Sequence, residues 1–293
     1  MNELKGLGTA LITPFKQDLS VDYPALDRLL DTQLAGGVDY LVVLGTTGEA
    51  VTLSAEERKA VRQYIAAYVQ GRLPLVLGVG GNNTAAVCAE LKTLESELKE
   101  NYAAILSVCP YYNKPSQEGL FRHFSAIAEA SPVPVILYNV PGRTGVNLLP
   151  ETVMRIYEAH PDKIAAIKEA SGNINQIKEL IAQFHSKPGI QDDDFLVISG
   201  DDAIACELME AGAAGLISVA SNAFPEAFRR IVHEKDAALQ AQYGEMIRLL
   251  FAEGNPAGIK TVLAQKGIIE NVLRLPLVSN STAVQEAIRS QLA

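Results

Sequence analysis

The chain has 293 residues, and its 34 Asp and Glu outnumber its 25 Lys and Arg, which gives a formal charge of −9. A chain this acidic, without basic blocks, is poorly suited to a phosphate backbone or an anionic membrane surface, so we expect no nucleic-acid and no membrane partner. Its composition, with 48% apolar and 20% charged residues, is typical of a folded protein with a large core.

The sequence carries no sign of export. No run of about 18 apolar residues occurs, and segment 1–6 has no apolar signal core, so we expect a cytoplasmic protein. The chain has three cysteines, Cys88, Cys109 and Cys206. This is an odd number, and no two of them form a C-x-x-C pair, which argues against disulfides and against a cysteine zinc site. We expect buried, reduced thiols.

Eight short apolar segments follow one another along the chain, about 30 residues apart up to the seventh, which is the length of one βα unit. They are rich in Val, Ile and Leu and mostly continuous, a pattern typical of parallel strands buried on both faces. The predicted strands are 9–13, 40–44, 75–78, 103–108, 135–138, 164–167, 195–199 and 215–219.

Longer amphipathic stretches separate these segments. The clearest begins with a capping box formed by Ser54 and Glu57, after which Val61, Ile65 and Val69 recur at helical spacing. This pattern predicts a helix between the second and third strands.

Eight βα units in one run predict an α/β fold, a (β/α)₈ TIM barrel. A doubly wound sheet of eight strands would need a long connection where the strand order reverses, and the sequence has none. After the eighth segment, apolar residues such as Ile231, Ile247 and Leu250 continue at helical spacing. We therefore expect residues 1–224 to form the catalytic barrel and 225–293 to form a C-terminal helical region.

Lys168 directly follows the sixth predicted strand, at the barrel end where active sites form. An apolar barrel mouth disfavours the charged ammonium, and the neutral amine is the form that attacks a carbonyl to give a Schiff base. The alternative is that Lys168 extends into solvent or pairs with Glu169.

The second predicted strand is followed by the turn Gly-Thr-Thr-Gly at 45–48. Its small residues expose backbone N–H groups, Thr46 and Thr47 add hydroxyl donors, and a following helix would add its N-terminal dipole, so the turn could bind a carboxylate. An ordinary glycine turn before a capped helix is the alternative.

Three further polar residues lie at the end of a predicted strand or after it. The Tyr138 phenol could move protons at the barrel mouth, although most tyrosines in this position only fill the core. Tyr112 belongs to a tyrosine doublet that could equally be interface packing. Arg143, in a Pro-Gly turn, offers a fixed fork of donors to a carboxylate, with an exposed salt bridge as the alternative.

No metal or cofactor is expected. The four histidines form no H-x-x-x-H pair and none follows a predicted strand. Asp201 and Asp202 could bind a metal, but their position favours capping of the next helix.

Five motifs in order resemble those of the pyruvate-dependent class I lyase and synthase family, and most closely its dihydrodipicolinate synthase branch. The resemblance extends from the segment GTALITPF at 8–15 to the helical tail. The motifs are GTTGE at 45–49, PYYNKP at 110–115, YNVPGRTG at 138–145, IKEASG at 167–172 and SGDD at 199–202.

The resemblance implies a cofactor-free lyase that condenses pyruvate with L-aspartate 4-semialdehyde, the first committed step of diaminopimelate and lysine biosynthesis. Its expected product is 4-hydroxy-tetrahydrodipicolinate. In this family pattern Lys168 matches the residue that forms the imine with pyruvate, while Tyr138, Thr46 and Tyr112 match a proton relay.

The same resemblance implies substrate-binding residues and an assembly. Thr47 matches the residue that binds the pyruvate carboxylate, with the Ile217 backbone lining the same pocket. Arg143 matches the residue that binds the carboxylate of the second substrate. Family members commonly form homotetramers, in which the residue matching Tyr112 completes the relay of a neighbouring subunit and the one matching Tyr111 packs across the interface.

One region departs from the branch. Feedback-inhibited members bind L-lysine with histidine and glutamate at positions that are Ala55, Arg58 and Ala86 here, although Tyr111 and Asn82 remain. Loss of a carboxylate and gain of a cation disfavour an ammonium ligand, so we expect weak or absent lysine inhibition.

Two other functions fit part of the pattern. A sialic-acid or 2-keto-3-deoxy-sugar-acid lyase would use the same imine with a sugar aldehyde, but Arg143 and the paired threonines favour the amino-acid branch. A catalytically silent barrel that binds a keto acid, or that serves as an interface module, would trap no adduct with borohydride.

Overall fold

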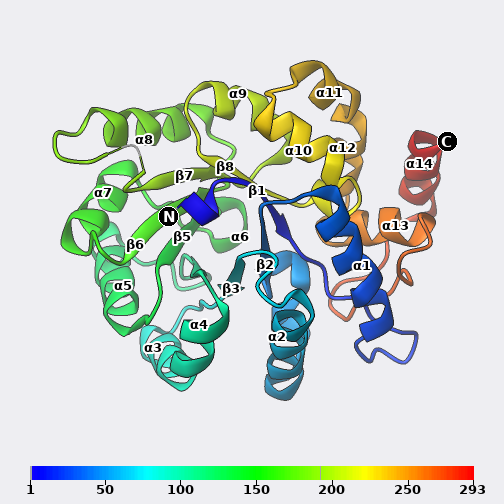
Figure 1. The fold of residues 1–293 in the computed structure, drawn as a ribbon, viewed down its shortest axis with the longest axis horizontal. Helices are drawn as coiled ribbons and strands as arrows, with labels where there is room; N and C mark the ends of the chain where they lie inside the picture. The colour runs from blue at the N-terminus through cyan, green and yellow to red at the C-terminus, as the bar shows by residue number, and fades with distance from the viewer. Residues whose placement is uncertain (1, 192) are drawn as a thin grey trace. The chain divides into compact units, whose positions relative to one another are not determined.

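The computed structural model describes residues 2–191 and 193–293. Eight parallel strands follow one another around a closed barrel in chain order, and helices connect them (Figure 1). This confirms the (β/α)₈ class predicted from the apolar segments. The strands are β1 Gly6–Ala10, β2 Tyr40–Val43, β3 Leu75–Gly78, β4 Ala104–Val108, β5 Val135–Asn139, β6 Ile164–Glu169, β7 Leu196–Ser199 and β8 Gly215–Ser218.

Helices lie between the strands and continue after β8 to the C-terminus. Among the described residues, no helix is both long and apolar enough to cross a membrane. The α-helices are α1 Tyr23–Gly36, α2 Ala55–Val69, α3 Thr84–Thr93, α4 Glu95–Asn101, α5 Gln117–Ala130, α6 Pro141–Thr144, α7 Pro150–Ala159, α8 Ile174–Ser186, α9 Ala205–Glu210, α10 Pro225–His233, α11 Ala237–Gln242, α12 Gly244–Phe251, α13 Ala257–Gln265 and α14 Thr282–Leu292.

The chain divides into two compact units. One holds residues 74–217 together with the N-terminal end, and the other holds residues 6–73 and 218–293. Within the second unit, α12 packs against α13 and α14, and α10 packs against α1 and β1. Helix α10 is therefore packed on the first strand and helix of the chain, whereas α12, α13 and α14 pack on one another.

The first strand lies earlier than the sequence predicts. It covers Gly6–Ala10 instead of 9–13, and Gly8 pairs with Tyr40 of β2. The glycines at its start interrupt the apolar run, so the pattern does not indicate a strand there. Packing explains why position 8 is a glycine, because a Cβ there would lie 2.2 Å from the Tyr40 ring. The predicted segment beyond Leu11 lies past the end of β1.

Strands β5 and β6 end later than predicted. The ladder between them continues through the pairs Tyr138 with Lys168 and Asn139 with Glu169. A search for apolar runs stops at the first polar side chain, whereas backbone pairing does not depend on side-chain polarity. Lys168 is therefore the fifth residue of its strand and not the first residue after it.

The capping box predicted at the start of α2 is confirmed. Ser54 Oγ accepts a hydrogen bond from Glu57 N–H (3.1 Å), and the Glu57 carboxylate accepts one from Ser54 N–H (2.9 Å). Val61, Ile65 and Val69 are buried along one face of the helix.

Candidate active site

Lys168 and Tyr138 lie side by side on β6 and β5. They are direct partners in the ladder, so both side chains project from the same face of the sheet. Lys168 Nζ lies 4.5 Å from the centroid of the Tyr138 ring, and each residue is 7% exposed. The structure thus places an amine and a phenol together at the carboxyl ends of two neighbouring strands.

Glu169 projects from the opposite face, because successive strand side chains alternate. Its carboxylate accepts hydrogen bonds from Asn139 Nδ2 (2.9 Å), Gln176 Nε2 (3.1 Å) and Ser171 N–H (2.8 Å). Burial raises the pKa of this carboxyl group above its usual value. The alternative that Lys168 pairs with Glu169 is therefore not the arrangement that the structure has.

Gly200 provides space for the Lys168 side chain. A Cβ at Gly200 would lie 2.9 Å from Lys168 Cε and 2.6 Å from the Ala170 Cβ. The sequence places this glycine in the motif at 199–202 but indicates no role for it. The structure gives a steric reason for it.

Arg143 lies on the short helix α6, which follows β5, and it is exposed. A buried amide network holds both ends of this loop: Asn139 Oδ1 accepts from Leu148 N–H (3.0 Å), and Asn139 Nδ2 donates to Asn147 Oδ1 (2.8 Å). Asn147 Nδ2 donates in turn to Gln176 Oε1 (2.7 Å). Sequence reasoning missed this network, although Asn139 lies inside a motif that it singled out.

Tyr112 lies on the loop after β4, and its side chain is 89% exposed. Its backbone is in the left-handed region (φ 75°), and its N–H donates to the carbonyl of Thr144, at the end of α6 (3.3 Å). Asn82 Nδ2 donates to the Tyr111 carbonyl (3.0 Å). The Tyr112 and Arg143 loops are thus joined through the backbone, while the Tyr112 ring projects away from its own chain.

Thr46 and Thr47 belong to the second unit, in a 3₁₀ turn over Thr46–Gly48. Thr46 is exposed, whereas Thr47 is buried and its Oγ1 accepts a hydrogen bond from Asn255 Nδ2 (2.9 Å). The predicted helix follows this turn, but it does not begin directly after Gly48. A second 3₁₀ turn, Ala50–Thr52, intervenes before α2 begins at Ala55.

Ile217 is the third residue of β8 and is buried, at 1% exposed.

No group of three or more His, Cys, Asp and Glu side chains able to hold a metal ion occurs among residues 2–191 and 193–293. Asp201 Oδ1 accepts from Ala203 N–H (2.9 Å) at the start of the turn Asp202–Ile204, so it caps that turn as expected.

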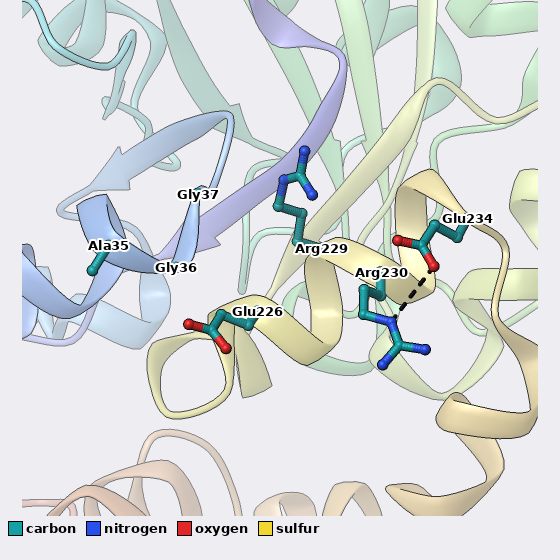
Figure 2. A pocket seen from close by; sticks show the side chains of 7 residues that line it. All are labelled: Ala35, Gly36, Gly37, Glu226, Arg229, Arg230 and Glu234. Atoms are coloured by element: carbon teal, nitrogen blue, oxygen red, sulfur yellow. Dashed lines mark ion pairs between the residues drawn. The ribbon is translucent and has the colours of Figure 1, made fainter.

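A surface hollow of about 510 Å³ lies elsewhere in the second unit, where the end of α1 meets α10 (Figure 2). Within it Arg230 Nε lies 3.5 Å from Glu234 Oε2. The hollow contains no residue expected in the site, and its charges are mixed, so we do not place the chemistry there. Its lining residues are Ala35, Gly36, Gly37, Glu226, Arg229, Arg230 and Glu234.

Comparisons with known proteins identify the family. The model of the dihydrodipicolinate synthetase family matches residues 3–293. The 4-hydroxy-tetrahydrodipicolinate synthase of Parabacteroides distasonis is 51% identical, over 99% of this chain and 96% of its own length.

Two solved structures extend the comparison to the fold. The chloride-inhibited dihydrodipicolinate synthase of Acinetobacter baumannii, complexed with pyruvate, is 38% identical with a TM-score of 0.91, over 99% of this chain and 98% of that one. The enzyme of Cyanidioschyzon merolae, with lysine bound, is 32% identical with a TM-score of 0.90, over 99% and 97%. Family model, whole-length identity and fold agree, and this chain belongs to the dihydrodipicolinate synthetase family, as a lyase.

Proposed function

We propose that this enzyme condenses pyruvate with L-aspartate 4-semialdehyde to give 4-hydroxy-tetrahydrodipicolinate, the first committed step of diaminopimelate and lysine biosynthesis. The observation that carries the proposal is the buried pair of Lys168 and Tyr138, with Nζ 4.5 Å from the ring centroid. The name of the Parabacteroides distasonis relative and the pyruvate complex of the Acinetobacter baumannii enzyme support the choice of substrates.

Imine formation is the first step. The Lys168 amine attacks the keto carbon of pyruvate, and after proton transfer the carbinolamine loses water to leave a protonated imine. Tyr138, whose ring lies beside the amine, moves these protons, with Thr46 and Tyr112 completing the relay. The positive imine then acts as an electron sink, so the relay takes up a methyl proton and an enamine forms.

Carbon–carbon bond formation follows. The enamine carbon attacks the aldehyde carbon of the second substrate, and the resulting alkoxide takes up a proton to become the 4-hydroxyl group. The amino group of that substrate then attacks the imine carbon and displaces the Lys168 amine, which closes the six-membered ring. One water is lost overall, and the free lysine is regenerated without a cofactor.

Substrate carboxylates need donors in a chain of net charge −9. We assign the pyruvate carboxylate to Thr47 and to the backbone at Ile217. Arg143, exposed on its loop, is assigned to the carboxylate of the aldehyde substrate, because a guanidinium offers two parallel donors to one carboxylate.

Borohydride reduction in the presence of pyruvate, followed by peptide mapping, tests the proposal. We expect one reduced pyruvyl adduct, on Lys168, and none in the Lys168→Arg variant. Lys260 is a stringent internal comparison, because burial lowers the pKa of this second buried lysine to about 8. An adduct on Lys260, or turnover with a sugar aldehyde in preference to the semialdehyde, would contradict the proposal.

We also propose that L-lysine inhibits this enzyme weakly or not at all. Ala55 and Ala86 offer no polar side chain, and Arg58 contributes a cation whose Nη1 donates to the Leu53 carbonyl (3.1 Å). The Cyanidioschyzon merolae enzyme with bound lysine shows that a relative takes this ligand. Initial rates against lysine concentration test the proposal, which a micromolar inhibition constant would refute.

A further inference from the structure

Thr47 has the only buried side chain of the Gly-Thr-Thr-Gly turn, and Asn255 forms a hydrogen bond with it. Its Nδ2 donates to Thr47 Oγ1 over 2.9 Å, although the two residues are 208 positions apart in the sequence. Asn255 is 6% exposed and Thr47 is 4% exposed. The contact is therefore a buried hydrogen bond that joins the residues just before α13 to the turn.

This bond determines what the Thr47 hydroxyl can do next. A hydroxyl group has one hydrogen to donate and two lone pairs that accept. Because the Asn255 amide occupies a lone pair, the hydroxyl hydrogen remains free to donate to another group. Donation from the amide also polarises the O–H bond, which strengthens its donation to an anion.

The backbone on the C-terminal side of Thr47 is held as well. Thr13 Oγ1 donates to the Gly48 carbonyl (2.7 Å). Glu49 has left-handed backbone geometry (φ 52°) and forms a fully buried ion pair with Lys260. Two contacts on successive residues therefore fix the direction in which the turn leaves Thr47.

The same C-terminal segment holds both Thr47, through Asn255, and Glu49, through Lys260. Lys260 lies five residues after Asn255, within α13, and its Nζ also donates to the Val272 carbonyl (3.0 Å). Arg274 N–H donates to Glu49 Oε2 (3.2 Å). The Thr47 turn is thus braced by residues of the helical C-terminal region, which carries no expected site residue.

We propose that Asn255 is a positioning residue, which presents the Thr47 hydroxyl as a hydrogen-bond donor to the carboxylate of the keto acid. The inference rests on the proposed function, because it takes that carboxylate as the group that Thr47 meets. Asn255 itself acts through Thr47 and does not touch the substrate.

The Asn255→Asp variant tests the inference with almost no change in shape. A carboxylate at this position accepts the Thr47 hydrogen instead of donating to the oxygen, so the hydroxyl no longer serves the substrate. We expect the pyruvate concentration at half-maximal borohydride trapping, and the KM for pyruvate, to rise about tenfold or more, with kcat and the KM for the aldehyde little changed.

Asn280→Asp is the matched control. Asn280 is also a buried asparagine of the C-terminal region, 4% exposed, but its Oδ1 accepts from Thr261 Oγ1 (2.9 Å) and it does not contact the turn. This variant places a carboxylate in the same region and should leave the KM for pyruvate unchanged. Asn255→Ala, which removes the carboxamide without adding a charge, provides a milder second variant, with an expected rise of about threefold.

A double-mutant cycle separates positioning from general damage. Thr47→Val removes the hydroxyl through which Asn255 acts, so Asn255→Asp should weaken pyruvate binding no further in that background. Effects that multiply in the double variant, or equal effects of Asn255→Asp and Asn280→Asp, would overturn the inference.

The failures of the two proposals are distinguishable. A wild-type enzyme that forms no pyruvate imine would contradict the proposed function and remove the basis of the inference. A wild-type enzyme that forms the imine, together with an Asn255→Asp variant of unchanged pyruvate affinity, would overturn the inference alone.

Discussion

Lys168 differs from Lys260, a second buried lysine, in what surrounds its amine. Both amines lie over an aromatic ring, Lys168 over Tyr138 and Lys260 over Phe15, but Lys260 also meets a carboxylate and a backbone carbonyl. A lysine that is paired with a carboxylate is held in a structural role, which supports our proposal that Lys168, and not Lys260, forms the imine. Burial alone does not distinguish the two lysines, whereas their neighbouring groups do.

Gly200→Ala should impair Lys168 without removing any functional group. The added methyl would lie 2.9 Å from Lys168 Cε, so the lysine must shift, and we expect slower imine formation by about tenfold with a loss of about 1–3 kcal/mol in stability. Rapid-mixing kinetics with pyruvate measure the rate of imine formation, and a thermal melt measures the loss of stability. Gly244→Ala is the control, because a Cβ there meets nothing within 4 Å; normal imine formation in Gly200→Ala would show that the space is not needed.

Cys109 should be inert to thiol reagents although it adjoins the tyrosine doublet. The residue is fully buried, burial raises the pKa of its thiol, and the thiolate is the reactive form. We expect no labelling of Cys109 in the native enzyme at about pH 8 and full labelling after unfolding, as measured by mass spectrometry of peptides. Cys88, which is only part-buried, serves as the comparison. Rapid native modification of Cys109 would contradict the burial argument.

At the scale of elements, helices α3 and α5 are joined by a buried histidine. His123 Nδ1 lies 2.8 Å from Thr84 Oγ1, and the ring packs edge-on against Phe124. Burial lowers the pKa of His123 to about 4. The neutral ring is the form that this helix pair accommodates.

His123 should make the enzyme sensitive to acid in a defined window. An unfolded histidine protonates near pH 6.5 but the folded one only near 4, so its contribution to stability is present above 6.5 and is lost as the pH falls to 4, by about 3 kcal/mol at most. Denaturant unfolding between these pH values should show a shallower pH dependence for His123→Gln than for wild type. Identical slopes would refute the assignment.

The boundaries of the strands and helices show which features can be predicted from the sequence alone. The apolar runs located all eight strands, and Ser54 with Glu57 located a helix start, because both signals are local. The start of β1 was missed because Gly8 is required by the Tyr40 ring, which is a contact between strands. Lys168 and Tyr138 were identified from their motifs, but their mutual distance is a property of the ladder register.

The rest of the site could not be predicted for the same reason. Nothing near Thr47 in the sequence indicates that Asn255 will bond to it, and nothing near Glu49 indicates Lys260. Such contacts depend on which helix packs where. A pattern of residue types within one segment carries no information about a partner 208 positions away.

At the scale of the whole molecule, we propose a homotetramer in which Tyr112 serves a neighbouring subunit. The Tyr112 ring is 89% exposed on its own chain, although its backbone is held in a left-handed conformation. A tyrosine whose backbone is held by a hydrogen bond and whose ring is exposed is well suited to contact another subunit.

Tyr112→Phe should lower kcat by about 100-fold and change KM little, because it removes a relay proton and leaves the binding groups in place. Steady-state kinetics measure the split, and sedimentation velocity shows whether the assembly is retained. Tyr111→Phe is the neighbouring control and should keep its activity. Unchanged turnover in Tyr112→Phe would remove Tyr112 from the relay.

The bond between Asn255 and Thr47 also has a consequence in time. A ribosome adds about 5–20 residues per second, so the 208 residues between the two partners take roughly 10–40 s to synthesise. For that interval a nascent chain carries the threonine turn without its Asn255 hydrogen bond. Under the role that we propose for Asn255, folding of the early βα units alone does not orient the Thr47 hydroxyl, and this step waits until residue 255 has been translated.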